Sequence, residues 1–162
     1  MRVDRLRRLL LASLSVALVM SAHADERPSL PAGQERHFIA EISWKNNTAY
    51  TPSDATGRAE FEIDLDSKTL SWDIRYEKLS SAPRGVWLHA PGQPGATGAP
   101  MINLATGELR PPVKGSAVLT DAQIEYLLTG WSYVLISTKK YPNGEARGQL
   151  NRARPEWMTI FK

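Results

Sequence analysis

The sequence predicts an all-β protein, an antiparallel β-sandwich with one short helix. Several short segments alternate apolar and polar residues, which is the period of a half-buried strand. Turn-forming residues separate these segments at intervals of roughly ten residues, and one segment alone has helical spacing. The chain has no cysteine among its 162 residues. Disulfides and thiolate metal sites are therefore excluded, and the fold depends on its core.

The first 24 residues are predicted to be a signal peptide. Four arginines precede an apolar run over residues 9–20, and Ala22-His23-Ala24 has the small-x-small pattern of a cleavage site. The run is shorter than the ~20 apolar residues that span a bilayer. We expect cleavage after Ala24, no transmembrane segment after cleavage, and a product that is periplasmic or secreted.

Cleavage would also remove the excess of positive charge. The whole chain has 20 basic and 17 acidic residues, of which four arginines and one aspartate precede Asp25, so the mature chain has 16 of each. A formal net charge of zero gives no reason to expect nucleic acid as a partner. The length of the mature chain suits a single domain.

The strands are predicted in order along the chain. Residues 25–36 contain prolines and a glycine without periodicity, which indicates an N-terminal strap. A first strand follows at 37–44, with Trp44 expected in the core. Residues 59–65 and 70–76 alternate apolar and charged residues around a short connection, which predicts a hairpin with one wet face and Trp72 in the core. Further strands are expected at 85–90, 101–104, 115–119, 132–138 and 145–151.

One helix is expected before the strand at 132–138. Thr120 and Gln123 have the spacing of a capping box, and Gly130 stands where a C-terminal cap belongs. Three apolar residues of the segment share one face: Ile124, Leu127 and Leu128. The domain is expected to occupy residues 37–151. The tail at 152–162 is apolar enough that we expect it to pack on the domain, with contact to a partner as the alternative.

Several motifs resemble the CHRD, or chordin-type, domain family. Residues 56–61 (TGRAEF), 70–80 (LSWDIRYEKLS) and the loop after His89 are similar to the first half of that domain. Residues 115–123 (GSAVLTDAQ) and the segment 133–150, which ends in PNGEARGQL, are similar to its second half. The resemblance extends over about Phe38 to Leu150.

The resemblance implies a β-sandwich of the general immunoglobulin or superoxide-dismutase kind. Its namesake, chordin, is an extracellular antagonist of growth factors, and the domain also occurs widely in exported bacterial proteins, of which this chain would be one. The resemblance implies a binding or structural module without established catalytic activity. A fold alone does not identify the ligand, so the expected partner is an unidentified extracytoplasmic protein or glycan.

The resemblance also raises the question of a metal site. Family members often carry His-x-His where this chain has Trp87-Leu88-His89, and His-Thr where it has Ser137-Thr138. Residues two apart on a strand share a face, so three such histidines could bind copper or zinc. The alternative function is accordingly a copper- or zinc-binding redox protein resembling superoxide dismutase. With Trp87 and Ser137 in those positions, His89 is the only residual ligand, and we expect no metal and no cofactor.

The predicted binding surface comprises Trp87, His89, Ser137, Glu145 and Arg147. Trp87 should project on the side of His89, and His89 itself is expected to hydrogen-bond a backbone carbonyl or the nearby polar strand. Glu145 and Arg147 share one face of the last strand. They could instead form a cross-strand ion pair.

No catalytic residue is predicted. The carboxylates of the predicted hairpin are Asp64, Asp66 and Asp73. They are expected on or near its wet face, where carboxylates are normally solvated, and no motif identifies two of them as an acid–base pair. The glycine-rich loop after His89 lacks the Gly-Lys-Ser/Thr ending of a phosphate-binding loop.

Overall fold

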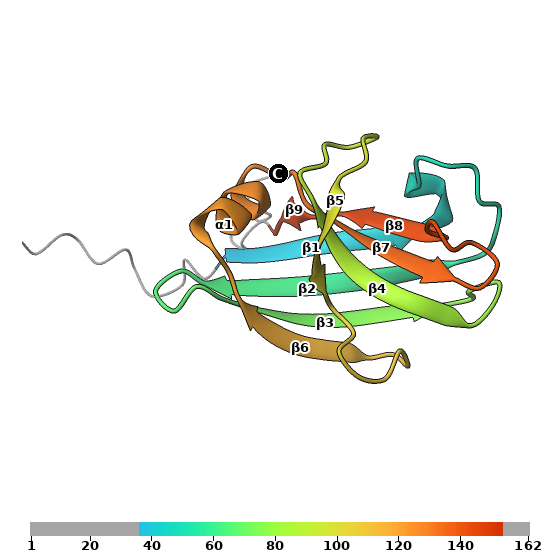
Figure 1. Ribbon diagram of the computed structural model, residues 1–162, viewed down its shortest axis with the longest axis horizontal. Coiled ribbons are helices and arrows are strands. Elements are labelled where there is room, and N and C mark those ends of the chain that lie inside the picture. The colour runs from blue at the N-terminus through green and yellow to red at the C-terminus, as the bar shows by residue number, and fades with distance from the viewer. Residues whose placement is uncertain (1–35, 154–162) are drawn as a thin grey trace, which may run out of the picture. The chain divides into compact units, whose positions relative to one another are not determined.

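The computed structural model describes residues 36–153, which form nine strands, one α-helix and one short 3-10 helix (Figure 1). The predicted signal peptide, the strap up to residue 35 and the tail from residue 154 lie outside the described residues. The strands are β1 (Arg36–Ser43), β2 (Thr56–Asp64), β3 (Thr69–Glu77), β4 (Pro83–Ala90), β5 (Ala99–Asn103), β6 (Val113–Val118), β7 (Tyr133–Thr138), β8 (Ala146–Gln149) and β9 (Asn151–Arg152); the helices are η1 (Trp44–Asn46) and α1 (Asp121–Leu128).

All strand pairs within residues 36–153 are antiparallel, and the predicted all-β fold with one short α-helix is confirmed. The hydrogen-bonded order is β5-β4-β7-β8-β1-β2-β3-β6, with β9 paired to β1. The sheet curls, so that β4 and β7 lie in front of β2 and β3 (Figure 1). The two layers therefore belong to one sheet that is continuous through β8 and β1.

The hairpin of β2 and β3 has the predicted register. Phe61 lies opposite Trp72, and Ala59 lies opposite Ile74. These four side chains are buried, while the charged residues that alternate with them face outward. Burying a large apolar side chain stabilises the fold by roughly 2 kcal/mol, and a one-residue slip would replace these side chains with charged ones.

The segment that follows β5 connects the two layers of the core. The indole Nε1 of Trp72 in β3 donates a hydrogen bond to the carbonyl of Leu104 at 3.0 Å, and the Leu104 amide donates to the carbonyl of Val86 in β4 at 2.9 Å. Because Trp72, Leu104 and Val86 are all buried, these bonds satisfy polar groups that would otherwise destabilise the core.

The prediction that Trp44 lies in the core is wrong. β1 ends at Ser43, whose side-chain oxygen accepts a hydrogen bond from the Lys45 amide and caps η1. The chain leaves the sheet there, so Trp44 is only half-buried and packs edge-on against Tyr50, with ring centroids 6.2 Å apart.

The helix α1 has the predicted ends. Thr120 Oγ1 accepts from the Gln123 amide at 3.3 Å, and Gln123 Oε1 accepts from the Thr120 amide at 2.9 Å. Gly130 follows the C-cap with a φ of 75°, a conformation that favours glycine. Ile124 and Leu127 are buried against the core, whereas Leu128 is exposed. In the described part of the chain, no helix has the length and apolar character needed to cross a bilayer.

Candidate functional site

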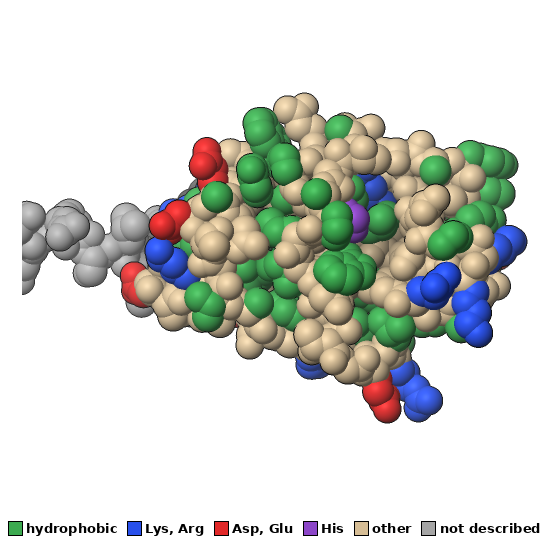
Figure 2. All heavy atoms as spheres, in the orientation of Figure 1, with side chains coloured by type: hydrophobic (Ala, Val, Ile, Leu, Met, Phe, Trp, Pro, Cys, Tyr) green, Lys and Arg blue, Asp and Glu red, His purple; other side chains and the backbone are tan. Residues whose placement is uncertain are grey.

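The candidate site lies on the outer face of β4, β7 and β8, the side of this layer that points away from the core. Pairing between β4 and β7 places Trp87 opposite Leu135 and His89 opposite Tyr133. Val86 and Leu88 alternate with these residues and are buried beneath them. This layer faces the viewer in Figures 1 and 2, and hydrophobic side chains occupy the middle of the face in Figure 2.

His89 is bound to the loop that follows its own strand. Its Nδ1 lies 3.0 Å from the carbonyl oxygen of Gly98, which is the predicted backbone hydrogen bond. Because a carbonyl can only accept, Nδ1 carries the proton and the lone pair of the neutral ring lies on Nε2. The imidazole also stacks on the ring of Tyr133, with centroids 5.1 Å apart and an interplanar angle of 19°.

The environment of His89 keeps its ring neutral. Burial lowers its pKa and the nearby charge of Arg147 lowers it further, while the bond to Gly98 opposes these effects; the net shift is downward from 6.5. At neutral pH the ring is therefore an uncharged donor that holds the loop.

Arg147 binds the same loop from β8. Only 2% of the residue is exposed. Its Nη1 donates to the carbonyl of Ala96 at 2.8 Å, and its Nη2 donates to the carbonyl of Gln93 at 3.1 Å. The guanidinium carbon lies 3.7 Å from the centroid of the Tyr133 ring, within the range of a cation–π interaction.

Gln149 and Tyr133 complete the anchoring of residues 91–98, which we call the 91–98 loop. Gln149 Nε2 contacts the carbonyl of Gly92 at 2.9 Å, and the Gly98 amide donates to the Tyr133 hydroxyl at 2.8 Å. Four side chains from three strands therefore hold one loop against the sheet through its main chain: His89, Tyr133, Arg147 and Gln149.

Glu145 belongs to a different network at the far end of β7. Glu145 is fully buried, with 0% of its surface exposed. Its carboxylate accepts from the Ser80 amide at 2.7 Å, the Ser80 hydroxyl at 2.9 Å and the Thr138 hydroxyl at 2.7 Å. Burial raises the pKa of Glu145, but these hydrogen bonds outweigh it, and the net shift is downward. The carboxylate therefore stays ionised.

The structure separates the residues of the predicted surface. Within residues 36–153, Glu145 and Arg147 form no cross-strand ion pair, because each is buried among different partners. Ser137 lies opposite Gly85, whereas His89 lies opposite Tyr133, four residues along β7. Four residues of strand span about 13 Å, so Ser137 is not beside His89. Trp87 and His89 do share a face, and Trp87 is 36% exposed.

Trp87 lies over a glycine. A β-carbon added at Gly85 would be 2.8 Å from the indole Nε1 of Trp87 and 3.5 Å from Ser137 Oγ. A larger residue at position 85 would therefore displace the indole. The face thus presents an aromatic side chain next to a hydroxyl, both held on the rigid frame of β4 and β7.

The residues around His89 do not fit a metal ion. Its Nδ1 is used by Gly98, and its neighbours on the face are an indole, a phenol ring and a guanidinium. None of these resembles the imidazole, thiolate or carboxylate ligands that copper and zinc prefer. Across residues 36–153, no three His, Cys, Asp or Glu side chains are grouped to hold a metal.

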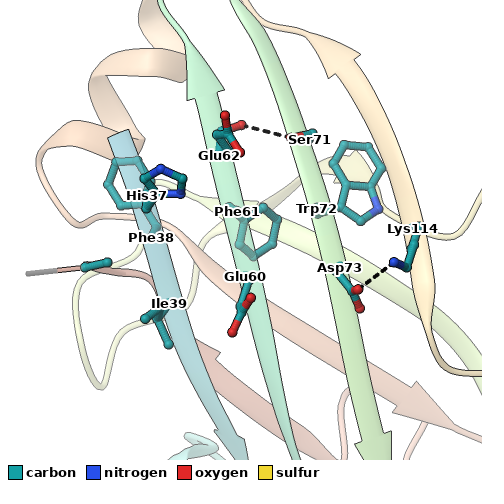
Figure 3. Close-up of a pocket in the computed structure, with 11 residues that line it drawn as sticks. His37, Phe38, Ile39, Glu60, Phe61, Glu62, Ser71, Trp72, Asp73 and Lys114 are labelled. Atoms are coloured by element: carbon teal, nitrogen blue, oxygen red, sulfur yellow. Dashed lines mark hydrogen bonds and ion pairs between the residues drawn. The ribbon is translucent and has the colours of Figure 1, made fainter. Parts of the chain in front are cut away.

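A second candidate is a groove of about 530 Å³ on the outer face of β1, β2, β3 and β6 (Figure 3). Asp73 is its most buried carboxylate and forms an ion pair with Lys114 at 2.8 Å. Hydrogen bonds from Lys114 and Arg75 lower the pKa of Asp73 despite its partial burial. A carboxylate held in this ionised state is a poor proton donor, so the groove lacks a general acid at this position.

Tyr133 and Gln149 are the anchoring residues that the sequence analysis missed. Both lie on the same face as His89, since Tyr133 pairs with His89 and with Gln149 in neighbouring strands. The alternation of side chains along β7 and β8 indicates that these two residues share that face. The sequence does not indicate that the 91–98 loop lies above them, because the position of the loop depends on contacts between distant segments.

Comparison with known proteins agrees with the motifs. The sequence model described as the CHRD domain matches residues 38–150, which is most of the chain and includes the four side chains that anchor the 91–98 loop. No curated protein and no solved structure matches the chain.

Proposed function

This chain belongs to the CHRD domain family, and we propose that it is an exported, non-catalytic binding or structural module, acting in the periplasm or outside the cell. The binding surface that we propose is the outer face of β4 and β7, around Trp87. His89 and Ser137 lie on the same face, while the buried Glu145 and Arg147 hold loops at the two ends of this layer.

One observation carries the proposal. The polar side chains of the motif at 145–149 make hydrogen bonds to the protein's own main chain and hydroxyl groups. Through these bonds Glu145 holds the connection between β3 and β4, and Arg147 holds the 91–98 loop. A site that performed proton transfer or nucleophilic attack would direct such groups toward a substrate. An exposed indole on a rigid strand is instead typical of a surface that binds a protein or a glycan.

Photo-crosslinking tests the surface. A photoreactive phenylalanine analogue replaces Trp87 in cells, and a control variant carries it at Glu62, which is exposed on the other layer. We expect discrete adducts from position 87 and none from position 62, which lines the second groove. A glycan array probed with the wild type and with Trp87→Ala covers the case of a sugar ligand. Equal labelling from both positions, together with an array that Trp87→Ala does not change, would contradict this surface.

Mass spectrometry tests the export. The protein recovered from the periplasm or the medium should begin at Asp25. Recovery of the intact chain in the cytoplasm would contradict the proposal.

Metal analysis addresses the redox alternative: copper or zinc bound tightly at one ion per chain, and lost in His89→Ala, would overturn the non-catalytic assignment.

A further inference from the structure

Five basic side chains gather at one end of the described domain. They come from η1, from the connection between β3 and β4 with the first residues of β4, and from the turn between β7 and β8, and all five are exposed. We call this surface the basic end and define it by Lys45, Lys78, Arg84, Lys139 and Lys140. The right-hand side of Figure 2 shows a cluster of Lys and Arg side chains.

Hydrogen bonds fix these three connections to one another. The Lys139 amide donates to the carbonyl of Ala82 at 3.0 Å, and the Lys140 amide donates to Ser81 Oγ at 2.9 Å. The Tyr141 hydroxyl donates to the carbonyl of Pro52 at 3.1 Å. Beneath them, the buried carboxylate of Glu145 binds Ser80. The basic end is therefore a single surface rather than three independent loops.

Few of these charges are neutralised by other residues of the described range. Among residues 36–153, Lys78 is the member of the basic end with an ion pair, to Glu77 at 3.9 Å. Asp54 and Glu77 are the exposed acidic residues of the same connections. Other acidic residues lie at the opposite end of the strands, in the β2–β3 turn and α1; they are Asp64, Asp66, Asp121 and Glu125. Glu108, in the connection between β5 and β6, lines a groove with Pro83 near the basic end, and Lys68 pairs with Asp121 at the opposite end. Basic side chains therefore predominate at the basic end, and acidic and basic side chains are mixed at the opposite end, as the left-hand side of Figure 2 illustrates.

Aromatic side chains accompany the basic residues. Tyr50 is 83% exposed, the most exposed of the large hydrophobic residues in the described chain. Lys45 lies 6.0 Å from the ring centroid of Trp44, and Lys140 lies 5.2 Å from that of Tyr141. Amphipathic rings interspersed with lysines are typical of surfaces that meet the headgroup layer of a membrane.

We infer that the basic end binds the surface of an anionic lipid bilayer. The charges come from three connections spread across the end of the domain, so a broad anionic surface contacts all of them together. Phosphate headgroups would attract the lysines, and Tyr50 would enter the headgroup layer. This inference goes beyond the proposed function, because its basic residues and Tyr50 are different from Trp87, His89 and Ser137.

Vesicle sedimentation tests the inference. The probes are vesicles of phosphatidylglycerol and phosphatidylcholine, and vesicles of phosphatidylcholine alone. The wild type should bind the anionic vesicles, and binding should weaken in high salt. Lys139→Gln with Lys140→Gln should lower the partition coefficient at least tenfold, since each basic residue near an anionic surface contributes roughly fivefold. Tyr50→Ser should lower it further.

Matched controls separate this surface from net charge and from the Trp87 face. Arg75→Gln with Lys114→Gln removes the same charge from the outer face of β3 and β6, and should change partition about twofold or less. Trp87→Ala should leave it unchanged. All variants have the same length, so residues outside 36–153 contribute equally, and circular dichroism checks their fold. Equal loss in both double variants, equal binding to uncharged vesicles, or tighter binding to soluble polygalacturonate than to the anionic vesicles would overturn the inference.

Discussion

At the scale of single residues, two buried charges organise the molecule without neutralising each other. Glu145 binds Ser80 and Thr138, while Arg147 binds the main chain of the 91–98 loop. A buried charge is tolerated when hydrogen bonds replace its solvation. The residues are two apart in sequence, so one short motif holds two loops at different ends of the same layer.

Replacing Glu145 should therefore lower the stability of the folded protein. Glu145→Ala leaves the Ser80 amide and the Thr138 hydroxyl without their acceptor, and we expect a loss of about 2–4 kcal/mol in the free energy of unfolding. Urea denaturation measures it. Glu62→Ala, an exposed residue of β2, serves as control and should change stability by about 0.5 kcal/mol or less. A similar small effect in both variants would show that the network around Glu145 does not stabilise the fold.

The same carboxylate should make stability depend on acidity. The pKa of Glu145 in the folded protein lies below its ordinary value of 4.5. Its contribution is therefore complete above that value and is lost as the pH falls through the lower, folded pKa. Urea denaturation of the wild type and of Glu145→Gln between neutral and acidic pH should show a shallower loss in the variant. Parallel curves would contradict the assignment.

His89 should titrate at lower pH than an exposed histidine. Burial lowers its pKa below 6.5, and Arg147 adds to the effect. The unfolded chain binds a proton first, so this group removes stability as the pH falls from 6.5 toward the folded pKa. Nitrogen NMR of the ring should show a neutral form protonated at Nδ1 at pH 7, because that atom faces the Gly98 carbonyl. A ring protonated at Nε2 instead would contradict the geometry.

At the scale of elements, alternation was sufficient to predict the strands but not the loop above them. The hairpin of β2 and β3 follows from a local period, and the capping box of α1 from residues three apart. The 91–98 loop is held by contacts such as that between Arg147 and Ala96, which are 51 positions apart. A charged residue in an alternating strand predicts a wet face, so its burial beneath a loop was not predictable.

The 91–98 loop should loosen when Arg147 becomes lysine. One ammonium group cannot reproduce the planar fork that reaches Ala96 and Gln93 while stacking on Tyr133. Hydrogen exchange should show the amides of Gly92 and Gly98 exchanging roughly tenfold faster, which is the effect of about 1.4 kcal/mol on local opening. Arg58→Lys, an exposed ion-pair residue, is the control. Unchanged exchange in Arg147→Lys would show that the other anchors hold the loop alone.

At the scale of the whole molecule, the proposed membrane contact depends on where the charges lie on the surface and not on the net charge. Residues 25–162 include 16 basic and 16 acidic residues. The strands nevertheless separate a basic end from acidic residues near α1. Turns at one end of a sheet meet there through strand pairing, so residues as distant as Lys45 and Lys140 share a surface. That clustering depends on topology, which is why net charge alone gave no indication of it.

Ion-exchange chromatography should reveal this separation in variants of equal net charge. Lys139→Gln with Lys140→Gln and Arg75→Gln with Lys114→Gln each remove two positive charges. The first pair removes charges that have no ion pair within residues 36–153, whereas Lys114 and Arg75 are paired with Asp73. A cation exchanger binds through the region of strongest positive potential. The first variant should therefore elute at clearly lower salt than the second, although their net charges are identical. Coincident elution would show that the charges of the basic end do not act together.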